Sequence, residues 1–598
     1  MCLAAHPDDE DGAGLAFYGK LRGVKTYNLL FTRGEGGQNE TGSELYEDLG
    51  ALRTRETMEA AKILSTEAYF LGYPDFGFSK TAKETFKKWG DKDGVVARLV
   101  FFIRALKPDV IITNHDTVTT KPSRQHGNHQ AVGISAYEAF ERAADPTFHP
   151  EQLKDGITVW QAKKLFCRVL RTESAANNSS LVEIDVRQRD STGMTIEQIA
   201  LEALHKHRSQ GLGNISLAAM PESFRRHRYS LIRSDRQYAF DNNDLFSGLV
   251  PSSKILASIE NAPTDSISPI RIVVSPNYLP FELPEETTQP QIHRTIAFSI
   301  LKRFPGTINA TIDVHGKNSL TILSHKNLSL ANDKYGDTLG IIFPKNQLVP
   351  DERLAIEIRQ MEHDRISDTA MANDVVTFKS VPADYEHGAL VGLVKTYDNT
   401  LEDIFNSFHV KYRLLDSTRL AKGDLRSYTA IVLDLRTFEF RTDAVQYANR
   451  LLEYAREGGN IICFYHKPND WNGKGYAPYP IVLSAERVTQ EDAPVAALKP
   501  NHPLLSSPNT LTPEDWMGWV QERSIYLPTD DTAKTSARYE RLLAMSDEDE
   551  QQPSTSLLWT YAGRGTYTYV SLVLYRQLRV LNSGAVKLLL NMISQPRH

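Results

Sequence analysis

Imidazole and carboxylate side chains crowd one short segment near the start of the chain. His6, Asp8, Asp9 and Glu10 place one histidine and three acidic residues within five positions. Carboxylates this close together repel one another and lose hydration when they are buried, whereas a bound divalent cation reverses that penalty. The segment therefore predicts a cation site.

A second segment has matching chemistry. His126 and His129 lie in a polar stretch, and we expect Gln130 to open the following helix. Both segments follow apolar runs typical of strands, 1–5 and 110–113, and parallel strands end at one edge of their sheet. Two histidines and one carboxylate would then form a three-ligand site with a position left for water, as in catalytic zinc centres. The same ligand set also suits ferrous iron.

The elements that must position these segments alternate along the first part of the chain, to about residue 245. We predict strands at 1–5, 25–31, 68–71 and 110–113, and helices at 12–21, 43–64 and 94–106. This alternation indicates a Rossmann-like α/β fold with a largely parallel sheet. The stretch carries no GxGxxG motif, so a dinucleotide site is not supported.

The rest of the chain has two further textures. Between 253 and 379, strand-like runs such as 270–275 and 307–314 are interrupted by prolines, which favours a small β-rich domain. Beyond 389 the α/β rhythm returns, with apolar runs at 390–395, 430–435 and 460–465 and a helix expected at 442–457. We predict three domains: a Rossmann-like domain at 1–250, a β-rich connector at 251–385, and a flavodoxin-like α/β domain at 386–598.

Composition narrows the class of protein. The 598 residues are 41% hydrophobic and 24% charged, which is typical of globular domains, and the net charge of −6 offers no footprint for nucleic acid. No apolar run approaches the ~20 residues of a membrane span. The three cysteines are too far apart for a cysteine-based zinc site. Oligomeric state stays open.

The first five residues resemble the last part of a buried strand. Met1 to Ala5 lead at once into the polar segment. We therefore expect that residues upstream, an export signal among them, have been trimmed. Export to the periplasm or the outside and a cytoplasmic location both stay open.

These residues resemble the LmbE and PIG-L family of zinc-dependent de-N-acetylases. The resemblance rests on His6-Pro7-Asp8-Asp9-Glu10, Thr32-Arg33-Gly34-Glu35, Arg53 with Glu56, Gly72-Tyr73-Pro74-Asp75, His126 to His129, and His207-Arg208-Ser209-Gln210. Large bacterial members are similar also at 33–39, 75–79, 476–480 and 519–523, so the resemblance reaches over nearly the whole chain. The C-terminal domain looks similar to glutamine-amidotransferase or ThuA-like folds.

The resemblance implies a role for each residue of the metal centre. His6, Asp9 and His129 would hold zinc, while Asp8 acts as general base and His126 faces the substrate. Either Asp8 or His126 would protonate the departing amine, and the sequence leaves that open.

Further residues complete the predicted site. Asp75 would raise the pKa of His126 and keep it cationic. We expect Arg53, Glu10 and Arg33 to contact the substrate, although Arg33 to Gly37 also fits a simple turn and Arg53 to Glu56 an exposed helix face.

One position departs from the family pattern. Many relatives carry an acidic residue immediately before the second metal-binding histidine, where this chain has Asn128. The tuning of the metal ligands by their neighbours is therefore expected to differ.

We predict that the chain hydrolyses an N-acyl, most plausibly N-acetyl, amide on an amino sugar or glycoconjugate, with Asp8 as the base for a metal-activated water. Two alternatives stay open. One is a ferrous oxygenase with the same two histidines and one carboxylate. The other is a carbohydrate-binding or scaffold protein with a vestigial metal site. Cys463 lies inside an apolar run, so we expect a core residue and no amidotransferase nucleophile.

Overall fold

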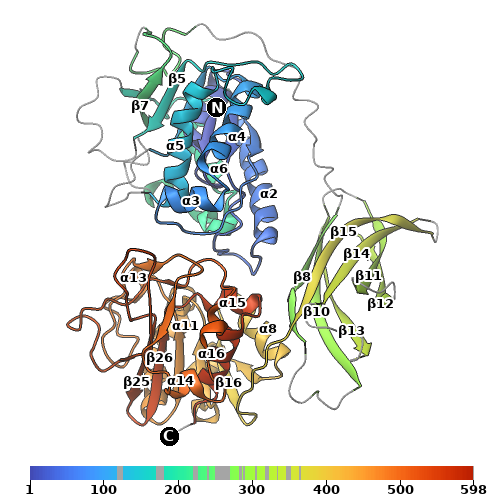
Figure 1. The fold of residues 1–598 in the computed structure, drawn as a ribbon, viewed down its shortest axis with the longest axis vertical. Helices are drawn as coiled ribbons and strands as arrows, with labels where there is room; N and C mark the ends of the chain where they lie inside the picture. Colours follow the sequence, from blue (N-terminus) through green and yellow to red (C-terminus); the bar gives the residue numbers. More distant parts are fainter. Residues whose placement is uncertain are drawn as a thin grey trace. The chain divides into compact units, whose positions relative to one another are not determined.

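The computed structural model divides the chain into two compact units, Met1–Thr264 and Asp265–His598 (Figure 1). The structure describes residues 1–116, 125–169, 181–219, 227–238, 241–249, 270–281, 286, 290–302, 306–316, 322–332, 334–344, 352–362 and 365–596. Within these ranges, none of the helices has the length and apolar character needed to cross a membrane.

A seven-stranded sheet forms the centre of the first unit. Its strands are β1 (Cys2–Ala4), β2 (Tyr27–Leu30), β3 (Glu67–Phe70), β4 (Val110–Thr113), β5 (Lys164–Arg168), β6 (Leu181–Ile184) and β7 (His227–Ser234). They are ordered β3-β2-β1-β4-β5-β7-β6, and the five from β3 to β5 are parallel. Because β1 and β4 are buried on both faces, all their residues are apolar except Thr113 at the end of β4. The four predicted strands and the largely parallel sheet are confirmed.

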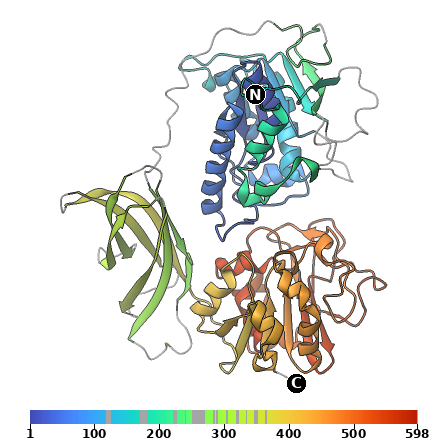
Figure 2. The same ribbon diagram turned by 180° about the vertical axis from the view of Figure 1, so that it is seen from behind.

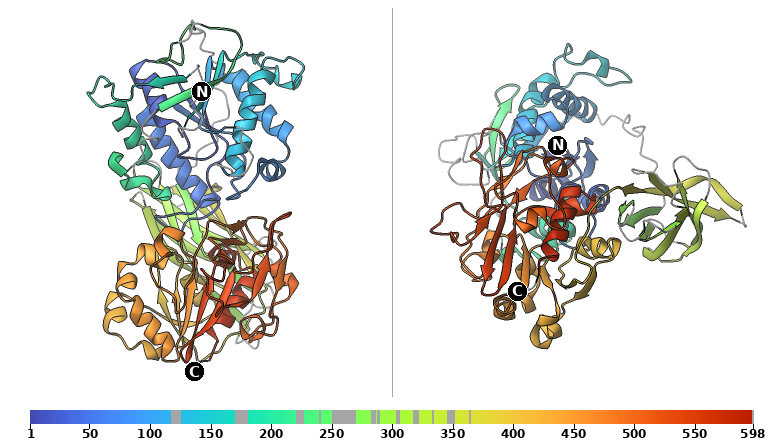
Figure 3. Two further views of the ribbon diagram at one scale, coloured as in Figure 1. Left: turned by 90° about the vertical axis from the view of Figure 1, so that its left-hand side faces the viewer. Right: turned by 60° about the horizontal axis from the view of Figure 1, so that its bottom comes forward.

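Helices cover both faces of this sheet (Figures 2 and 3). They are α1 (Gly12–Ala16), continued by a π-helical turn (Phe17–Leu21), α2 (Glu47–Leu64), α3 (Ala82–Lys88), α4 (Lys92–Leu106), α5 (Gly127–Arg142) and α6 (Ile196–Leu204). Successive strand residues point to opposite faces. Leu3 accordingly joins a core with α3, α4 and α5, whereas Cys2 joins a second core with α1, α2 and α6. The result is the three-layer α/β arrangement that the alternation predicts.

The second unit begins with two antiparallel sheets. Their strands are β8 (Ile270–Ser275), β9 (Tyr278–Pro280), β10 (Gln291–Lys302), β11 (Ile308–Gly316), β12 (Ile322–Leu330), β13 (Lys334–Pro344), β14 (Arg353–Glu362) and β15 (Arg365–Lys379). One sheet is ordered β13-β10-β8 and the other β12-β11-β14-β15-β9, with β9 the one parallel neighbour. Ile296 of the first sheet and Ile312 of the second belong to one buried core. The predicted β-rich texture is confirmed, while the boundaries at 250 and 385 stay predictions.

An α/β arrangement fills the remainder of the second unit. Its main sheet holds β16 (Leu390–Val394), β17 (Lys411–Leu414), β18 (Ala430–Leu433), β19 (Asn460–Phe464), β23 (Glu540–Arg541), β25 (Leu557–Ala562) and β26 (Gly565–Val570). The order is β17-β16-β18-β19-β26-β25-β23, parallel from β17 to β26. Two small strand pairs are β20 (Arg487–Val488) with β22 (Ser524–Ile525) and β21 (Val495–Ala497) with β24 (Leu543–Met545).

The helices of this part differ from the sequence prediction at one place. They are α8 (Thr400–Ser407), α9 (Ser417–Lys422), α10 (Thr437–Phe440), α11 (Thr442–Gln446), α12 (Ala448–Arg456), α13 (Pro468–Trp471), α14 (Pro503–Ser506), α15 (Leu574–Arg579) and α16 (Ser583–Ile593). The single helix predicted at 442–457 is wrong, because Tyr447 leaves helical geometry, with φ −105° and ψ 18°, and separates α11 from α12. Cys463 is fully buried in β19, as predicted.

Candidate metal centre

Two polar segments meet at the carboxyl edge of the first unit's sheet because β1 and β4 are parallel neighbours. The segment from His6 to Glu10 follows β1. The other follows β4 and reaches α5, which begins at Gly127 with His126 as its N-terminal cap residue. The expectation that Gln130 opens the helix is therefore wrong. His129 already lies in the first helical turn. The helix thus fixes the direction of the His129 side chain.

The side chains of His6, Asp9 and His129 are in contact. His6 Nδ1 lies 2.9 Å from Asp9 Oδ2, and His129 Nε2 lies 3.1 Å from the same oxygen. The ring centroids of the two histidines are 5.3 Å apart. The structure thus brings together the three residues that the sequence predicts as metal ligands.

The donor set fits a divalent cation. Although His129 Nε2 is buried and 3.1 Å from Asp9 Oδ2, it makes no hydrogen bond with any residue that the structure describes. Two electron-pair donors that approach without bonding to each other are suited to a shared ion. Tetrahedral zinc with bonds of ~2.1 Å separates its ligands by about 3.4 Å, close to the contacts seen here.

Two other histidines lie beside this set. Two groups of three donors lie within 4.8 Å of one another, His6 with His126 and His129, and Asp9 with His115 and His129. His115 Nε2 already accepts the N–H of Ala5 at 3.1 Å. His6 Nε2 is likewise 3.2 Å from the side-chain nitrogen of Asn128, so these bonds do not choose among the histidines. We favour His6, Asp9 and His129 because they are the ligands that the sequence predicts.

The sequence reasoning missed His115. Its ring stacks on that of His129 with centroids 4.3 Å apart, and burial lowers the pKa of His115 to about 3, with His129 adding to the effect. It is therefore a neutral ring that packs behind His129. The available signal was its position two residues after β4, at the same sheet edge that singled out His6.

Asp8 occupies an unfavourable backbone conformation. Its φ is 89°, a region that residues with a Cβ rarely adopt. Burial raises the pKa of the Asp8 carboxyl to about 7, and the neighbouring Asp9 adds to this shift. Strained residues persist where the surrounding structure holds them, and they are frequent at functional sites.

His126 does not have the electrostatic surroundings that the sequence suggested. Burial lowers the pKa of His126 well below its usual value, and His129 and His6 lower it further. Asp75 instead lies 3.8 Å from His6 Nε2, and although burial opposes the change, Asp75 helps to raise the pKa of His6 to about 9. The prediction that Asp75 keeps His126 cationic is not supported. The Nδ1 atom of His126 is buried without a hydrogen-bond partner among the described residues.

Asn128 links His6 to the residues around it. Its side-chain nitrogen lies 3.2 Å from His6 Nε2, and its oxygen accepts hydrogen bonds from the hydroxyls of Ser79 (3.0 Å) and Thr85 (2.9 Å). Asn128 is fully buried. The residue at which this chain departs from the family pattern thus orients a predicted metal ligand.

The predicted substrate contacts have partners within the protein. Arg53 is buried, and its guanidinium donates to the carbonyl oxygens of Gly34 (2.6 Å) and Gln38 (2.9 Å). Arg33 pairs with Glu47 at the surface. The structure therefore uses Arg53 to hold the loop after β2, and its contact with a substrate stays a prediction. Because Arg53 and Glu56 are both buried, the reading of an exposed helix face is wrong.

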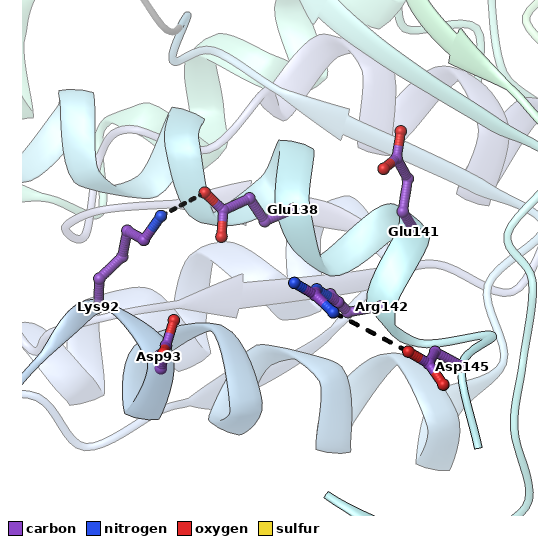
Figure 4. Close-up of a pocket in the computed structure, with 6 residues that line it drawn as sticks. All are labelled: Lys92, Asp93, Glu138, Glu141, Arg142 and Asp145. Atoms are coloured by element: carbon purple, nitrogen blue, oxygen red, sulfur yellow. Dashed lines mark hydrogen bonds and ion pairs between the residues drawn. The ribbon is translucent and has the colours of Figure 1, made fainter. Parts of the chain in front are cut away.

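A cavity of about 490 Å³ lies away from these residues, on the outside of α4 and α5 (Figure 4). Its lining is made of six charged side chains: Lys92, Asp93, Glu138, Glu141, Arg142 and Asp145. Lys92 pairs with Glu138 at 2.6 Å and Arg142 lies 3.9 Å from Asp145, so both cations of the lining already have acidic partners. We therefore place the chemistry at the histidine cluster.

Comparison with known proteins points to the same part of the chain. Residues 1–140 match the family model described as PIG-L, GlcNAc-PI de-N-acetylase. A relative named 1D-myo-inositol 2-acetamido-2-deoxy-alpha-D-glucopyranoside deacetylase 2, from Saccharopolyspora erythraea, is 29% identical over 284 residues, which cover 42% of this chain and 100% of the relative.

Solved structures give weaker likenesses. An N,N'-diacetylchitobiose deacetylase from Pyrococcus horikoshii has 21% identity and a TM-score of 0.27 over 35% of this chain and 69% of its own. A β-galactosidase from Bacillus circulans sp. alkalophilus has 12% identity and a TM-score of 0.23 over 34% of this chain and 31% of its own. Neither score is high enough to assign a fold.

Proposed function

From the PIG-L/LmbE family domain that residues 1–140 form, we propose that this chain is a zinc-dependent hydrolase that removes an N-acetyl group from an amino sugar or glycoconjugate. The relative from Saccharopolyspora erythraea is named as a deacetylase of an N-acetylated glucosaminide, which supports de-N-acetylation as the reaction class. The observation that carries the proposal is the contact of His129 and His6 with one oxygen of Asp9, where no hydrogen bond satisfies His129 Nε2.

His6, Asp9 and His129 would hold the ion. A zinc ion bound there supplies a water of lowered pKa and polarises the acyl carbonyl. Two neutral imidazoles and one carboxylate form an N,N,O set with a single negative charge, which suits zinc and also ferrous iron. Family membership favours zinc.

Asp8 would receive the proton of the attacking water on a carboxylate oxygen. It follows β1 directly and precedes Asp9, so its backbone is fixed next to the ligand set. Asp8 is only partly buried, so a water molecule can still reach its carboxylate. A base held in this way contributes about 10²–10⁴-fold to a rate.

His126 would donate a hydrogen bond to the acyl oxygen. Its Nδ1 has no hydrogen-bond partner among the described residues, and its ring centroid lies 3.8 Å from that of His129. A buried donor beside the reacting carbonyl stabilises the developing oxyanion. Return of a proton to the departing amine falls to Asp8 or to His126.

For the α/β part of the second unit we propose a flavodoxin-like fold with a binding role. In the order β17-β16-β18-β19-β26 the second strand lies outside the first, as in doubly wound sheets of the order 2-1-3-4-5. Because Cys463 is buried inside β19, and burial raises the pKa of its thiol to about 12, amidotransferase chemistry at this residue is not supported.

The experiment that tests the function is a screen for acetate release. The full chain is loaded with zinc and incubated with N-acetylglucosamine, N,N'-diacetylchitobiose and N-acetylglucosaminyl-inositol, with and without a chelator. Acetate that appears with zinc, disappears with the chelator and returns when zinc is restored supports the proposal. Zinc binding without acetate release from any of the three would count against it.

A further inference from the structure

A turn far along the chain contacts the segment that carries the catalytic carboxylates. The turn is the short 3-10 helix Arg208–Gln210 with His207 before it, here called the 207–210 turn. His207 Nε2 donates to Glu10 Oε1 at 2.8 Å, since a carboxylate can only accept. Gln210 Nε2 donates to the carbonyl oxygen of Pro7 at 2.7 Å. Two side chains of the turn thus hold the segment on either side of Asp8.

The turn is itself fixed to α2 and to the loop after β2. Ser209 donates from its backbone N–H and its hydroxyl to the two oxygens of Glu56, at 2.9 and 2.7 Å. Its carbonyl oxygen accepts the N–H of Glu40 at 2.8 Å. Because Ser209 and Glu56 are both buried, these bonds are shielded from water. The turn therefore offers a rigid support.

Glu10 connects this support to Asp8. Its Oε2 accepts the backbone N–H of Asp8 at 3.0 Å, while its Oε1 accepts from His207. Asp8 has a φ of 89°, a conformation that a residue with a Cβ keeps only under constraint. The bond that the Asp8 N–H donates to Glu10 directly constrains this peptide.

We propose that Glu10, His207 and Gln210 are positioning residues, which hold Asp8 in its left-handed conformation so that its carboxylate faces the ligand set of His6, Asp9 and His129. This inference rests on the proposed function and replaces the expected role of Glu10 as a substrate contact. Burial supports the change, because the Glu10 side chain is 5% exposed and that of His207 is 0% exposed. Neither has surface to offer a substrate.

The test compares two substitutions at one position in the zinc-loaded full chain. His207→Leu removes the donor to Glu10, whereas His207→Gln retains an N–H donor. We expect His207→Leu to lower kcat by about 10²-fold, the scale of a misplaced catalytic group, with KM and zinc content unchanged. His207→Gln should recover most of the loss.

A second measurement does not depend on turnover. Hydrogen–deuterium exchange of peptides covering 4–12 should be faster by roughly tenfold in His207→Leu than in the parent, and near the parent rate in His207→Gln. If His207→Leu does not fold, Gln210→Met takes its place, since it removes only the donor to Pro7. Should the parent release no acetate, the proposed function fails, and exchange at 4–12 still decides the positioning role.

Two results would overturn the inference. One is an unchanged kcat and unchanged exchange in the donor-removing variant that is measured, His207→Leu or, where that does not fold, Gln210→Met. The other is loss of zinc together with kcat, because the turn would then support the metal ligands as a whole and not Asp8.

Discussion

His129 Nε2 lies 3.1 Å from Asp9 Oδ2, yet the two atoms share no hydrogen bond. Asp9 Oδ2 also accepts from His6 Nδ1 at 2.9 Å. A buried imidazole nitrogen without a hydrogen-bond partner lowers the stability of the fold by about 1–3 kcal/mol. Such a nitrogen is expected where it has a functional partner, such as a bound ion. An ion bound between these atoms would recover the lost stability and so couple metal binding to folding.

Replacing His129 by alanine should remove metal and activity together. The variant loses one of three ligands, and the two that remain cannot retain zinc against dialysis. Metal content per chain and acetate release are measured on the same sample. His149→Ala, at a half-exposed histidine of the same unit, serves as the control and should keep both. Full zinc occupancy in His129→Ala would remove this residue from the ligand set.

Replacing Asp8 by asparagine should separate metal binding from turnover. The amide cannot accept the proton of water, so kcat should fall by about 10²-fold or more while zinc content stays at the parent value. Asp93→Asn, on the exposed start of α4, should have no effect on either. Undiminished acetate release from Asp8→Asn would refute the role of general base.

Asn128 should set the affinity for the metal through His6. Replacing it by alanine frees the His6 ring from its neighbour at 3.2 Å, and loss of such an outer contact typically lowers metal affinity by 10–100-fold. Competition with a zinc chelator measures the change. Asn591→Ala is matched in type and burial but lies in the second unit, and should leave zinc affinity unchanged. Equal affinities in the two variants would contradict the role of Asn128.

The elements that carry the centre could be predicted from local patterns. β4 has the bounds expected from its apolar run, and β1 and β2 lie inside their predicted ranges. The convergence of His6 with His129 followed from one rule, because parallel neighbouring strands end at the same edge. Spacing along the chain was sufficient there, since each histidine lies within a few residues of a strand or helix end.

Other roles in the site depend on contacts between residues far apart in the sequence, and these could not be predicted from local patterns. Glu10 was expected to contact the substrate, but His207, 197 residues away, bonds to its Oε1. Likewise, Arg53 was expected to contact the substrate, but its guanidinium donates hydrogen bonds to the carbonyl oxygens of Gly34 and Gln38. The pKa of His126 depends on how deeply the ring is buried, which no local pattern reports.

Arg104 should contribute more to stability than any surface arginine of the first unit. It is fully buried, and its guanidinium donates to the carbonyl oxygens of Ala143 (3.1 Å), Asp145 (2.6 Å) and Phe148 (2.9 Å) beyond the end of α5. Arg104→Met removes all three of these bonds, although Ala143 and Asp145 keep the backbone N–H groups of Trp160 and Phe148 as donors. The free energy of unfolding should fall by about 3 kcal/mol. Urea unfolding measures it. Arg55→Met, on the exposed face of α2, should change it by less than about 0.5 kcal/mol.

Asp434 should make the second unit less stable as the pH rises. Its carboxylate follows β18 and is 2% exposed, and burial, with a contribution from Asp398, raises its pKa to about 7. A folded-state pKa above the unfolded value of 3.8 means that ionisation disfavours the folded state. The cost is absent below about pH 4, grows by about 1.4 kcal/mol per pH unit up to pH ~7, and is constant above that.

Asp434→Asn removes this titration, although it also weakens the bonds that the carboxylate accepts from Thr396, whose N–H and hydroxyl lie 3.1 and 2.9 Å from Oδ2. That second loss adds an offset that hardly varies with pH. The difference in unfolding free energy, variant minus parent, should therefore rise between pH 4 and pH 7 by up to about 4 kcal/mol, whatever its sign at pH 4. Denaturant unfolding of the second unit at four or more pH values measures this slope. A difference that is flat from pH 4 to pH 8 would mean that Asp434 is already ionised in the folded chain at low pH, held by its hydrogen bonds against the cost of burial.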